Sequence, residues 1–145
     1  MFLGRYSHSF DDKGRIAVPT RFRDLLNDGA YLTQGFDKNL MVWRIVDFEK
    51  IYEQVNNMSI TDPNARLLKR LIFANAVHVD VDKVGRVLVP QYLRDAVDLS
   101  GNAVIVGVGD YFEIWSPSLW EAQSNQIQDS ETNAQRFAAL NLSAK

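Results

Sequence analysis

Two pairs of residues in this sequence combine a carboxylate with a guanidinium at the same spacing. Asp11 precedes Arg15 by four positions, and Asp82 precedes Arg86 by four. An arginine fork can donate two parallel hydrogen bonds to O6 and N7 of guanine in the major groove of DNA. The two arginines therefore indicate recognition of guanine, with about 1–3 kcal/mol of discrimination for each bidentate contact.

Each of these arginines directly follows a glycine that predicts a tight turn. Gly14 stands before Arg15, and Gly85 stands before Arg86. Glycine supplies the positive φ that two-residue hairpin loops commonly need. The arginine side chains would then start from a rigid backbone on a two-stranded β-ribbon, an element that fits the major groove.

The motif residues also have plainer interpretations. Asp11 and Asp82 either accept hydrogen bonds from turn amides, as Asp often does, or orient the arginine that follows. Arg15 and Arg86 either read bases or are solvated and ion-paired surface residues. The spacing alone does not decide between these alternatives.

Other cations near the motifs suit the phosphate backbone. Lys13 and Lys83 carry compact ammonium charges in the turns, and Arg5 lies just upstream of the first motif. Arg21 and Arg23 either contact phosphate or belong to a solvated helix face. Phosphate contacts position a protein on DNA but read no sequence.

The elements that must position these residues are duplicated in the chain. Residues 11–19 read Asp-Asp-Lys-Gly-Arg-Ile-Ala-Val-Pro, and residues 82–90 read Asp-Lys-Val-Gly-Arg-Val-Leu-Val-Pro. After a one-residue slip the alignment continues through three identical pairs, Gly35 with Gly107, Trp43 with Trp115 and Glu49 with Glu121. The order of these matches predicts an internal duplication.

Both copies have the same predicted elements. Each has a strand, a glycine turn, a β-branched strand that a proline ends, a short helix, a second hairpin and a closing helix. The last helix of the second copy begins either with Ser116 as its cap or with a capping box of Ser118 and Glu121. Trp43 and Trp115 are predicted to pack in the core between the halves.

We divide the chain into four segments on this basis. Residues 1–55 form the first repeat, 56–75 a helical connector, 76–127 the second repeat, and 128–145 a polar tail. The tail is either disordered or helical around residues 134–140.

Composition excludes several classes of site. The 145 residues include no cysteine, and His8 and His78 do not align in the repeat, so neither a zinc site nor any other metal site is expected. No phosphate-binding glycine loop or nucleophile motif is present, which argues against an enzyme, a cofactor or a small-molecule substrate. No apolar run approaches a membrane span, and residues 1–6 lack signal-peptide features, so we expect a cytoplasmic protein without a membrane partner.

The charge is unevenly distributed. Residues 1–71 hold 11 Lys and Arg against 9 Asp and Glu, whereas residues 72–145 hold 5 against 9. The net charge of −2 argues mildly against nucleic acid, but the basic residues concentrate near the first motif.

The duplicated Asp-x-x-x-Arg, followed by an apolar strand and proline, resembles the AbrB-like swapped-hairpin family. Two copies in a chain of this length, with a Met-Phe-x-Gly start, resemble the MraZ family of transcriptional regulators. The resemblance implies an α+β fold, in which tandem AbrB-like swapped-hairpin repeats form one small β-barrel flanked by short helices.

The same resemblance implies a function. MraZ-like proteins form rings that present their Asp-x-x-x-Arg loops to double-stranded DNA. They bind G-rich direct repeats in the promoter of their own cell-division and cell-wall operon, act mainly as repressors, and are nucleoid-associated. By position, the motif residues here are Asp11, Arg15, Asp82 and Arg86. Lys83 departs from the pattern, because it stands one position earlier in its turn than Lys13 does.

Two other functions remain open at this stage. An AbrB-like antitoxin or global regulator is close in fold, but such proteins usually carry one copy, so the duplication argues against it. An oligomeric scaffold with a protein partner fits the acidic C-terminal half. Salt-sensitive DNA binding would separate a DNA regulator from a scaffold.

Overall fold

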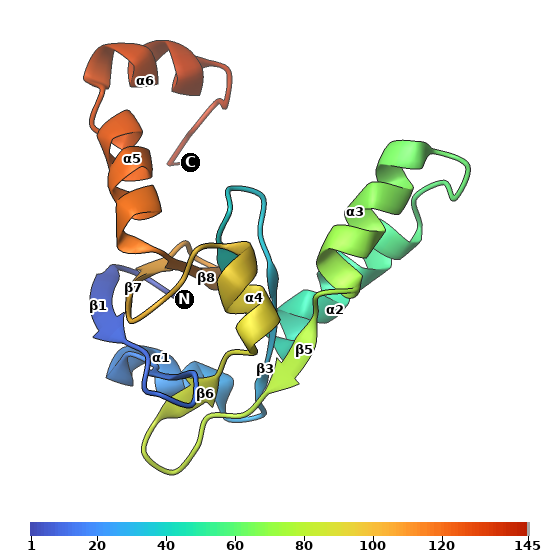
Figure 1. Cartoon of the computed structure of the whole chain (residues 1–145). Helices are drawn as coiled ribbons and strands as arrows, with labels where there is room; N and C mark the ends of the chain where they lie inside the picture. The colour runs from blue at the N-terminus through green and yellow to red at the C-terminus, as the bar shows by residue number, and fades with distance from the viewer. Residues whose placement is uncertain (145) are drawn as a thin grey trace.

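The computed structural model describes residues 1–144, which fold as a mixed α+β protein (Figure 1). The strands are β1 (Arg5–Ser9), β2 (Arg15–Ala17), β3 (Ala30–Gln34), β4 (Leu40–Arg44), β5 (Val77–Val79), β6 (Arg86–Leu88), β7 (Asn102–Gly107) and β8 (Tyr111–Trp115). The helices are α1 (Thr20–Arg23), α2 (Ile45–Asn56), α3 (Pro63–Phe73), α4 (Gln91–Ala96), α5 (Pro117–Ile127) and α6 (Ser130–Ala138), with a 3₁₀ turn, η1 (Asp24–Leu26).

The two copies exchange their first strands. Six strands form an antiparallel sheet in the order β1-β7-β8-β4-β3-β5, and β2 pairs with β6 in a separate ribbon. β1 of the first copy thus pairs with β7 of the second, while β5 of the second pairs with β3 of the first. Corresponding strands occupy corresponding places from either edge, which gives the sheet a pseudo-two-fold symmetry. This pairing confirms the expected interleaving of the hairpins.

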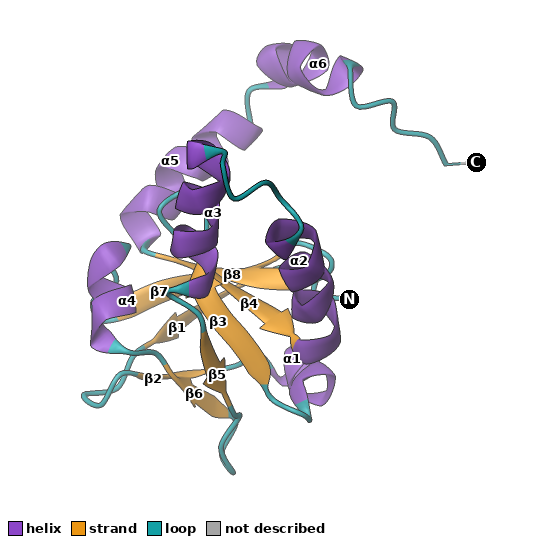
Figure 2. Cartoon of the chain, turned by 90° about the vertical axis from the view of Figure 1, so that its right-hand side faces the viewer, coloured by secondary structure: helices purple, strands orange, loops and turns teal. Residues whose placement is uncertain are grey.

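The expected closed β-barrel is wrong, because the sheet is open at β1 and β5. Within residues 1–144, one isolated β-bridge links the end of β1 to the ribbon, and it pairs Phe10 with Ile16. The ribbon strands and β5 are three residues long, too short to continue a ladder around the sheet. The ribbon instead packs on one face of the sheet through buried side chains (Figure 2).

The main core lies between the ribbon, α1, α4 and this face of the sheet. Phe2, Phe22 and Phe112 meet there, with ring centroids 5.0–5.2 Å apart. Edge-on and tilted aromatic pairs of this kind stabilise a core beyond the area they bury. Since Phe2 and Phe22 belong to the first copy and Phe112 to the second, the copies share one core.

A second apolar cluster lies on the opposite face of the sheet, under α2 and α3. Its buried members are Met41, Trp43, Phe48, Val55 and Ile72. Trp43 stacks on Tyr111 of the second copy with ring centroids 4.3 Å apart, which confirms that this tryptophan packs between the halves.

In the second copy, the helices α5 and α6 bury much less of their surface than α2 and α3 do. No side chain of α5 or α6 is buried, and both helices extend away from the sheet (Figures 1 and 2). Ser116 caps α5, since its hydroxyl accepts a hydrogen bond from the Leu119 amide at 3.3 Å. The Ser116 alternative is therefore correct, and the capping box at Ser118 is not the cap.

Candidate nucleic-acid interface

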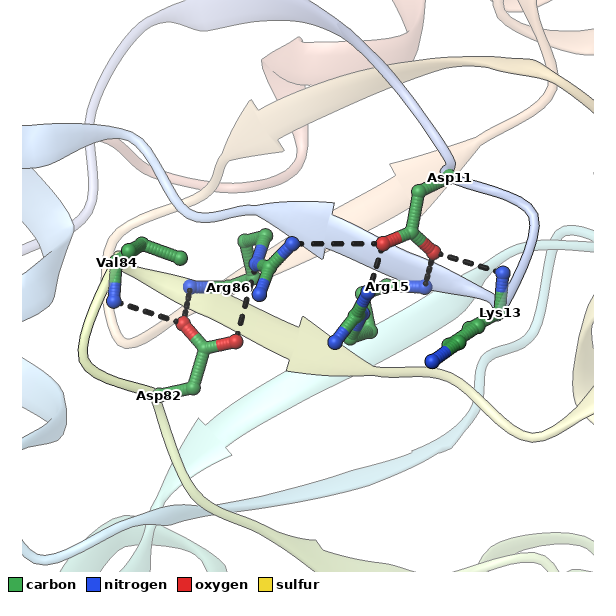
Figure 3. A network of polar contacts seen from close by, with 6 residues as sticks. All are labelled: Asp11, Lys13, Arg15, Asp82, Val84 and Arg86. Atoms are coloured by element: carbon green, nitrogen blue, oxygen red, sulfur yellow. Dashed lines mark hydrogen bonds and ion pairs between the residues drawn. The ribbon is translucent and has the colours of Figure 1, made fainter.

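The ribbon of β2 and β6 sorts its side chains by strand alternation. Ile16 pairs with Val87, and both are buried against the core. Because successive side chains of a strand point to opposite faces, the flanking residues point outward. These outward residues are Arg15, Ala17, Arg86 and Leu88. The structure therefore brings both motif arginines to one outer face (Figure 3).

Asp11 organises the first turn and also holds the arginine that follows it. Its Oδ1 accepts hydrogen bonds from the backbone amides of Lys13 and Arg15, each at 2.9 Å. Its Oδ2 accepts a hydrogen bond from Nε of Arg15 at 2.7 Å. The two interpretations of this aspartate are thus both realised in the same carboxylate.

Asp82 repeats the arrangement in the second turn. Its Oδ1 accepts from the amides of Val84 at 3.1 Å and Arg86 at 2.9 Å, and its Oδ2 accepts from Arg86 Nε at 3.0 Å. The duplicated spacing therefore encodes a duplicated geometry. In each turn a four-residue interval lets one carboxylate bind two amides and a guanidinium.

One ion pair joins the two motifs, and it runs from Arg86 of the second motif to Asp11 of the first. Arg86 Nη1 lies 3.5 Å from Oδ2 of Asp11, across the ribbon (Figure 3). Asp11 thus contacts both motif arginines, whereas Asp82 is bonded to Arg86. This network gives the pseudo-symmetric ribbon a polarity, with Asp11 at its centre.

The hydrogen bonds stabilise the ionised form of both carboxylates. The Arg15 backbone amide is the largest cause that lowers the pKa of Asp11, to about 2, and the Arg15 side chain adds to it. The Arg86 backbone amide likewise lowers the pKa of Asp82. Both aspartates are therefore charged at neutral pH, and they offset part of the positive charge of the ribbon.

The turn glycines are required by conformation and by space. Gly14 and Gly85 have φ values of +82° and +86°, which non-glycine residues rarely adopt. A Cβ on residue 14 would lie 2.8 Å from Nη2 of Arg94, and a Cβ on residue 85 would overlap the guanidinium of Arg23. Each turn is thus packed against an arginine of the other copy.

These two arginines are functional supports that the sequence interpretation missed. Arg23 Nε donates to the carbonyl of Val18 at 2.9 Å, and Arg94 Nε donates to that of Val89 at 3.1 Å. Arg23 is half-buried, so a solvated helix face does not describe it fully, and a phosphate contact stays a prediction. The available signal was the alignment of Arg23 with Arg94 in the repeat.

The remaining predicted cations lie in two places. Lys13 and Lys83 are exposed in the two turns, beside the ribbon. Arg5 begins β1, where it pairs with Val106 of β7. The two lysines thus lie in the turns of the ribbon, whereas Arg5 lies on an edge strand of the sheet.

No metal centre is formed among residues 1–144, where no group of three or more His, Cys, Asp or Glu side chains is placed to hold an ion. A cavity of about 270 Å³ beside the second turn includes Arg23, Asp24, Asp80 and Lys83 in its lining. Its lining thus combines cationic and anionic side chains. No helix within residues 1–144 has the length and apolar character needed to cross a membrane.

The fold and the ribbon define a class of protein, a tandem repeat of swapped β-hairpins that displays carboxylate-held arginines. The chain belongs to the MraZ family. The family model described as "MraZ protein, putative antitoxin-like" matches residues 1–71 and 72–141, one match for each copy.

Full-length relatives agree with this assignment. The chain is 43% identical over 141 residues to "Transcriptional regulator MraZ" of Thermomicrobium roseum, covering 97% of this chain and 99% of the relative. It is also 43% identical over 138 residues to the protein of the same name from Roseiflexus sp. strain RS-1, covering 95% and 94%. The family is thus one of transcriptional regulators.

Proposed function

We propose that this chain is a sequence-specific DNA-binding transcriptional regulator, mainly a repressor, that inserts its β2–β6 ribbon into the major groove. The observation that carries the proposal is the placement of Arg15 and Arg86 on one outer face, each held at Nε by a carboxylate. Anchoring Arg15 through Nε leaves its Nη groups to donate to guanine O6 and N7. The buried Ile16 and Val87 hold the ribbon rigid behind them.

The other site residues have supporting roles. Lys13 and Lys83 contact phosphates beside the groove, since both are exposed in the turns. Asp11 and Asp82, with their turn glycines, fix the geometry of the arginines. Arg5 contacts phosphate on a different part of the duplex or on DNA bound by a neighbouring subunit, because it lies on an edge strand of the sheet and not on the ribbon.

The operator we propose is a set of G-rich direct repeats in the promoter of the chain's own cell-division and cell-wall operon, bound by a ring of subunits at the nucleoid. Two motif arginines are few for a specific regulator. A ring that engages successive repeats gains avidity of roughly 10²–10⁴ without new contacts. Exposed apolar residues of the C-terminal helices, Ile127 and Phe137, support contacts between subunits.

Fluorescence anisotropy with synthetic duplexes tests this function. The wild type is titrated with a G-rich direct-repeat duplex and with a scrambled duplex of equal composition, across a salt series. We expect a preference for the repeats and a steep loss of affinity with salt, because phosphate contacts release counterions. Arg15→Ala and Arg86→Ala lose the preference, whereas Lys50→Ala on α2 keeps it.

Size-exclusion chromatography with light scattering confirms that each variant keeps its oligomeric state. If the wild type binds neither duplex at low salt, direct DNA binding is wrong. If it binds both duplexes equally, the ribbon contacts DNA without reading guanine.

A further inference from the structure

The outer face of the ribbon carries an aliphatic side chain beside its arginines. Leu88 is 54% exposed and lies directly opposite Arg15 in the register of β2 and β6. Its neighbours Val87 and Val89 are buried, so strand alternation holds Leu88 on the arginine face. Single exposed leucines are common, and the register of Leu88 therefore matters more than its exposure.

Comparison of the two copies shows that the fold does not require a leucine here. Leu88 corresponds to Ala17 in the first copy, at the same outward position of the same ribbon. In the turns, Val84 of the second copy stands where the first has Lys13, and Val84 is 62% exposed. The second copy thus places aliphatic groups on the ribbon and its turn where the first copy has a smaller residue and a cation.

The major-groove edge of DNA offers one apolar group, the C5-methyl of thymine. Directly opposed residues of an antiparallel pair have Cβ atoms roughly 4.5–5.5 Å apart, and successive base pairs are roughly 3.4 Å apart. When Arg15 spans a guanine, the side chain of Leu88 therefore comes over an adjacent base pair. We propose that Leu88 reads the methyl group of a thymine next to the guanine that Arg15 contacts.

This inference rests on the proposed function, and it adds a direction to the recognition. A ribbon with exact two-fold symmetry would read a duplex equally well in both orientations. Here Arg15 lies opposite Leu88, whereas Arg86 lies opposite Ala17, so one end of the ribbon requires the apolar contact and the other does not. Such polarity suits direct repeats, in which every site has the same orientation.

Removal of one methyl group from the DNA tests the contact. One duplex carries direct repeats with a thymine beside each guanine run, and a matched duplex has deoxyuridine at those positions, which removes only the methyl. We expect wild type to bind the deoxyuridine duplex more weakly by about fourfold for each repeat that a ribbon contacts, the loss for one buried methyl-sized group. Leu88→Ala binds the thymine duplex correspondingly more weakly and loses nothing further on the deoxyuridine duplex.

Leu67→Ala, which removes an exposed leucine of α3, is the matched control and retains the wild-type response to deoxyuridine. A second pair of duplexes places the thymines on the strand opposite the guanine run, so that either strand can supply the methyl. If wild type binds all four duplexes but never distinguishes thymine from deoxyuridine, the role of Leu88 is overturned while guanine recognition stands. The same holds if the distinction persists in Leu88→Ala. If no duplex is bound, the proposed function fails and this inference fails with it.

Discussion

Arg23 occupies the space into which a side chain on residue 85 would project, and Arg94 lies in the same way against Gly14. Each arginine belongs to one copy and each glycine to the other. The amide of Val18 also donates to the carbonyl of Gly85 at 2.8 Å, and that of Val89 donates to Gly14 at 2.9 Å. Each motif turn is therefore completed by the opposite copy, and a single copy lacks these supports.

Gly85→Ala should destabilise the protein more than Gly101→Ala. Both glycines have positive φ, so alanine costs about 1–2 kcal/mol at either position. A Cβ at residue 101 meets nothing within 4 Å, whereas one at residue 85 must displace Arg23. Overpacking of this kind costs a further 1–3 kcal/mol, roughly. Urea unfolding of the two variants measures the difference.

The two variants should also differ at the DNA site. Gly85→Ala shifts the turn that holds Arg86 and lowers the preference for G-rich repeats, whereas Gly101→Ala leaves it unchanged. Equal stability losses in the two variants would show that Arg23 moves aside without cost.

Asp11→Asn should impair sequence discrimination more than Asp82→Asn. Asparagine keeps an oxygen that accepts from the turn amides, so the turns survive, but it loses the charge that holds the guanidinium. Asp11 contacts Arg15 and Arg86, whereas Asp82 is bonded to Arg86. We expect the ratio of affinities for repeat and scrambled duplexes to fall roughly tenfold for Asp11→Asn and about threefold for Asp82→Asn.

The affinity for scrambled DNA distinguishes this role from a loss of folding. Removal of an anion beside phosphates reduces repulsion, so Asp11→Asn should bind scrambled duplex as well as wild type or better. A variant that weakens on both duplexes in parallel would indicate structural damage instead of misplaced arginines.

The sequence predicts the parts of this fold that depend on local chemistry. The period-2 strands and the glycine turns follow from neighbouring residues, and the repeat makes both visible twice. The Ser116 cap was one of two alternatives and has no counterpart at Arg44, which begins α2 in the first copy. The open sheet does not follow, because closure depends on whether β1 and β5 pair with the ribbon over a long range. Nothing within either strand records that choice.

The candidate site also combines contacts that local sequence predicts with contacts that depend on tertiary structure. The position of Arg15 after Asp11 predicts their pairing, since a turn brings residues four apart together. The contact of Arg86 with Asp11 depends on the register of two strands from different copies, and strand register is set by tertiary packing. The role of Arg23 was missed because its partners are uncharged: its Nε donates to the carbonyl of Val18, and its guanidinium lies against Gly85 of the other copy.

Glu113→Gln should stabilise the protein at pH 7. Burial raises the pKa of the Glu113 carboxyl, although a hydrogen bond from Trp115 Nε1 at 3.0 Å opposes the shift. A raised pKa in the folded state means that protonation favours folding. This stability is fully present below the unfolded pKa and is lost as pH rises through the folded value. Glutamine retains an acceptor for Trp115 and removes the cost of a partly buried charge.

The comparison is made by thermal unfolding at pH 4 and pH 7. The advantage of Glu113→Gln over wild type should be larger at pH 7 and shrink toward pH 4, where the wild-type carboxyl becomes protonated. Glu121→Gln on α5 is the matched control, because it makes the same substitution at an exposed position. An advantage that is the same at both pH values would assign the effect to packing.

Truncation after Gln128 should separate assembly from folding. The helix α6 buries none of its side chains, so its removal should leave the midpoint of thermal unfolding of the core nearly unchanged. Phe137 on this helix and Leu140 just after its end are 51% and 70% exposed in the single chain. If they join subunits, light scattering should give a smaller particle for the truncated chain and for the double variant Phe137→Ser, Leu140→Ser.

Binding to DNA then reports what assembly contributes. Smaller particles should bind a multi-repeat duplex far more weakly, up to the roughly 10²–10⁴ of avidity, yet bind a single-repeat duplex as wild type does. A truncated chain that assembles normally would move the subunit contact to another surface, such as the cationic side of α3 that carries Arg66, Lys69 and Arg70. A truncated chain that dissociates but keeps its affinity for repeats would instead show that one ribbon suffices, and the ring would then serve a purpose other than avidity.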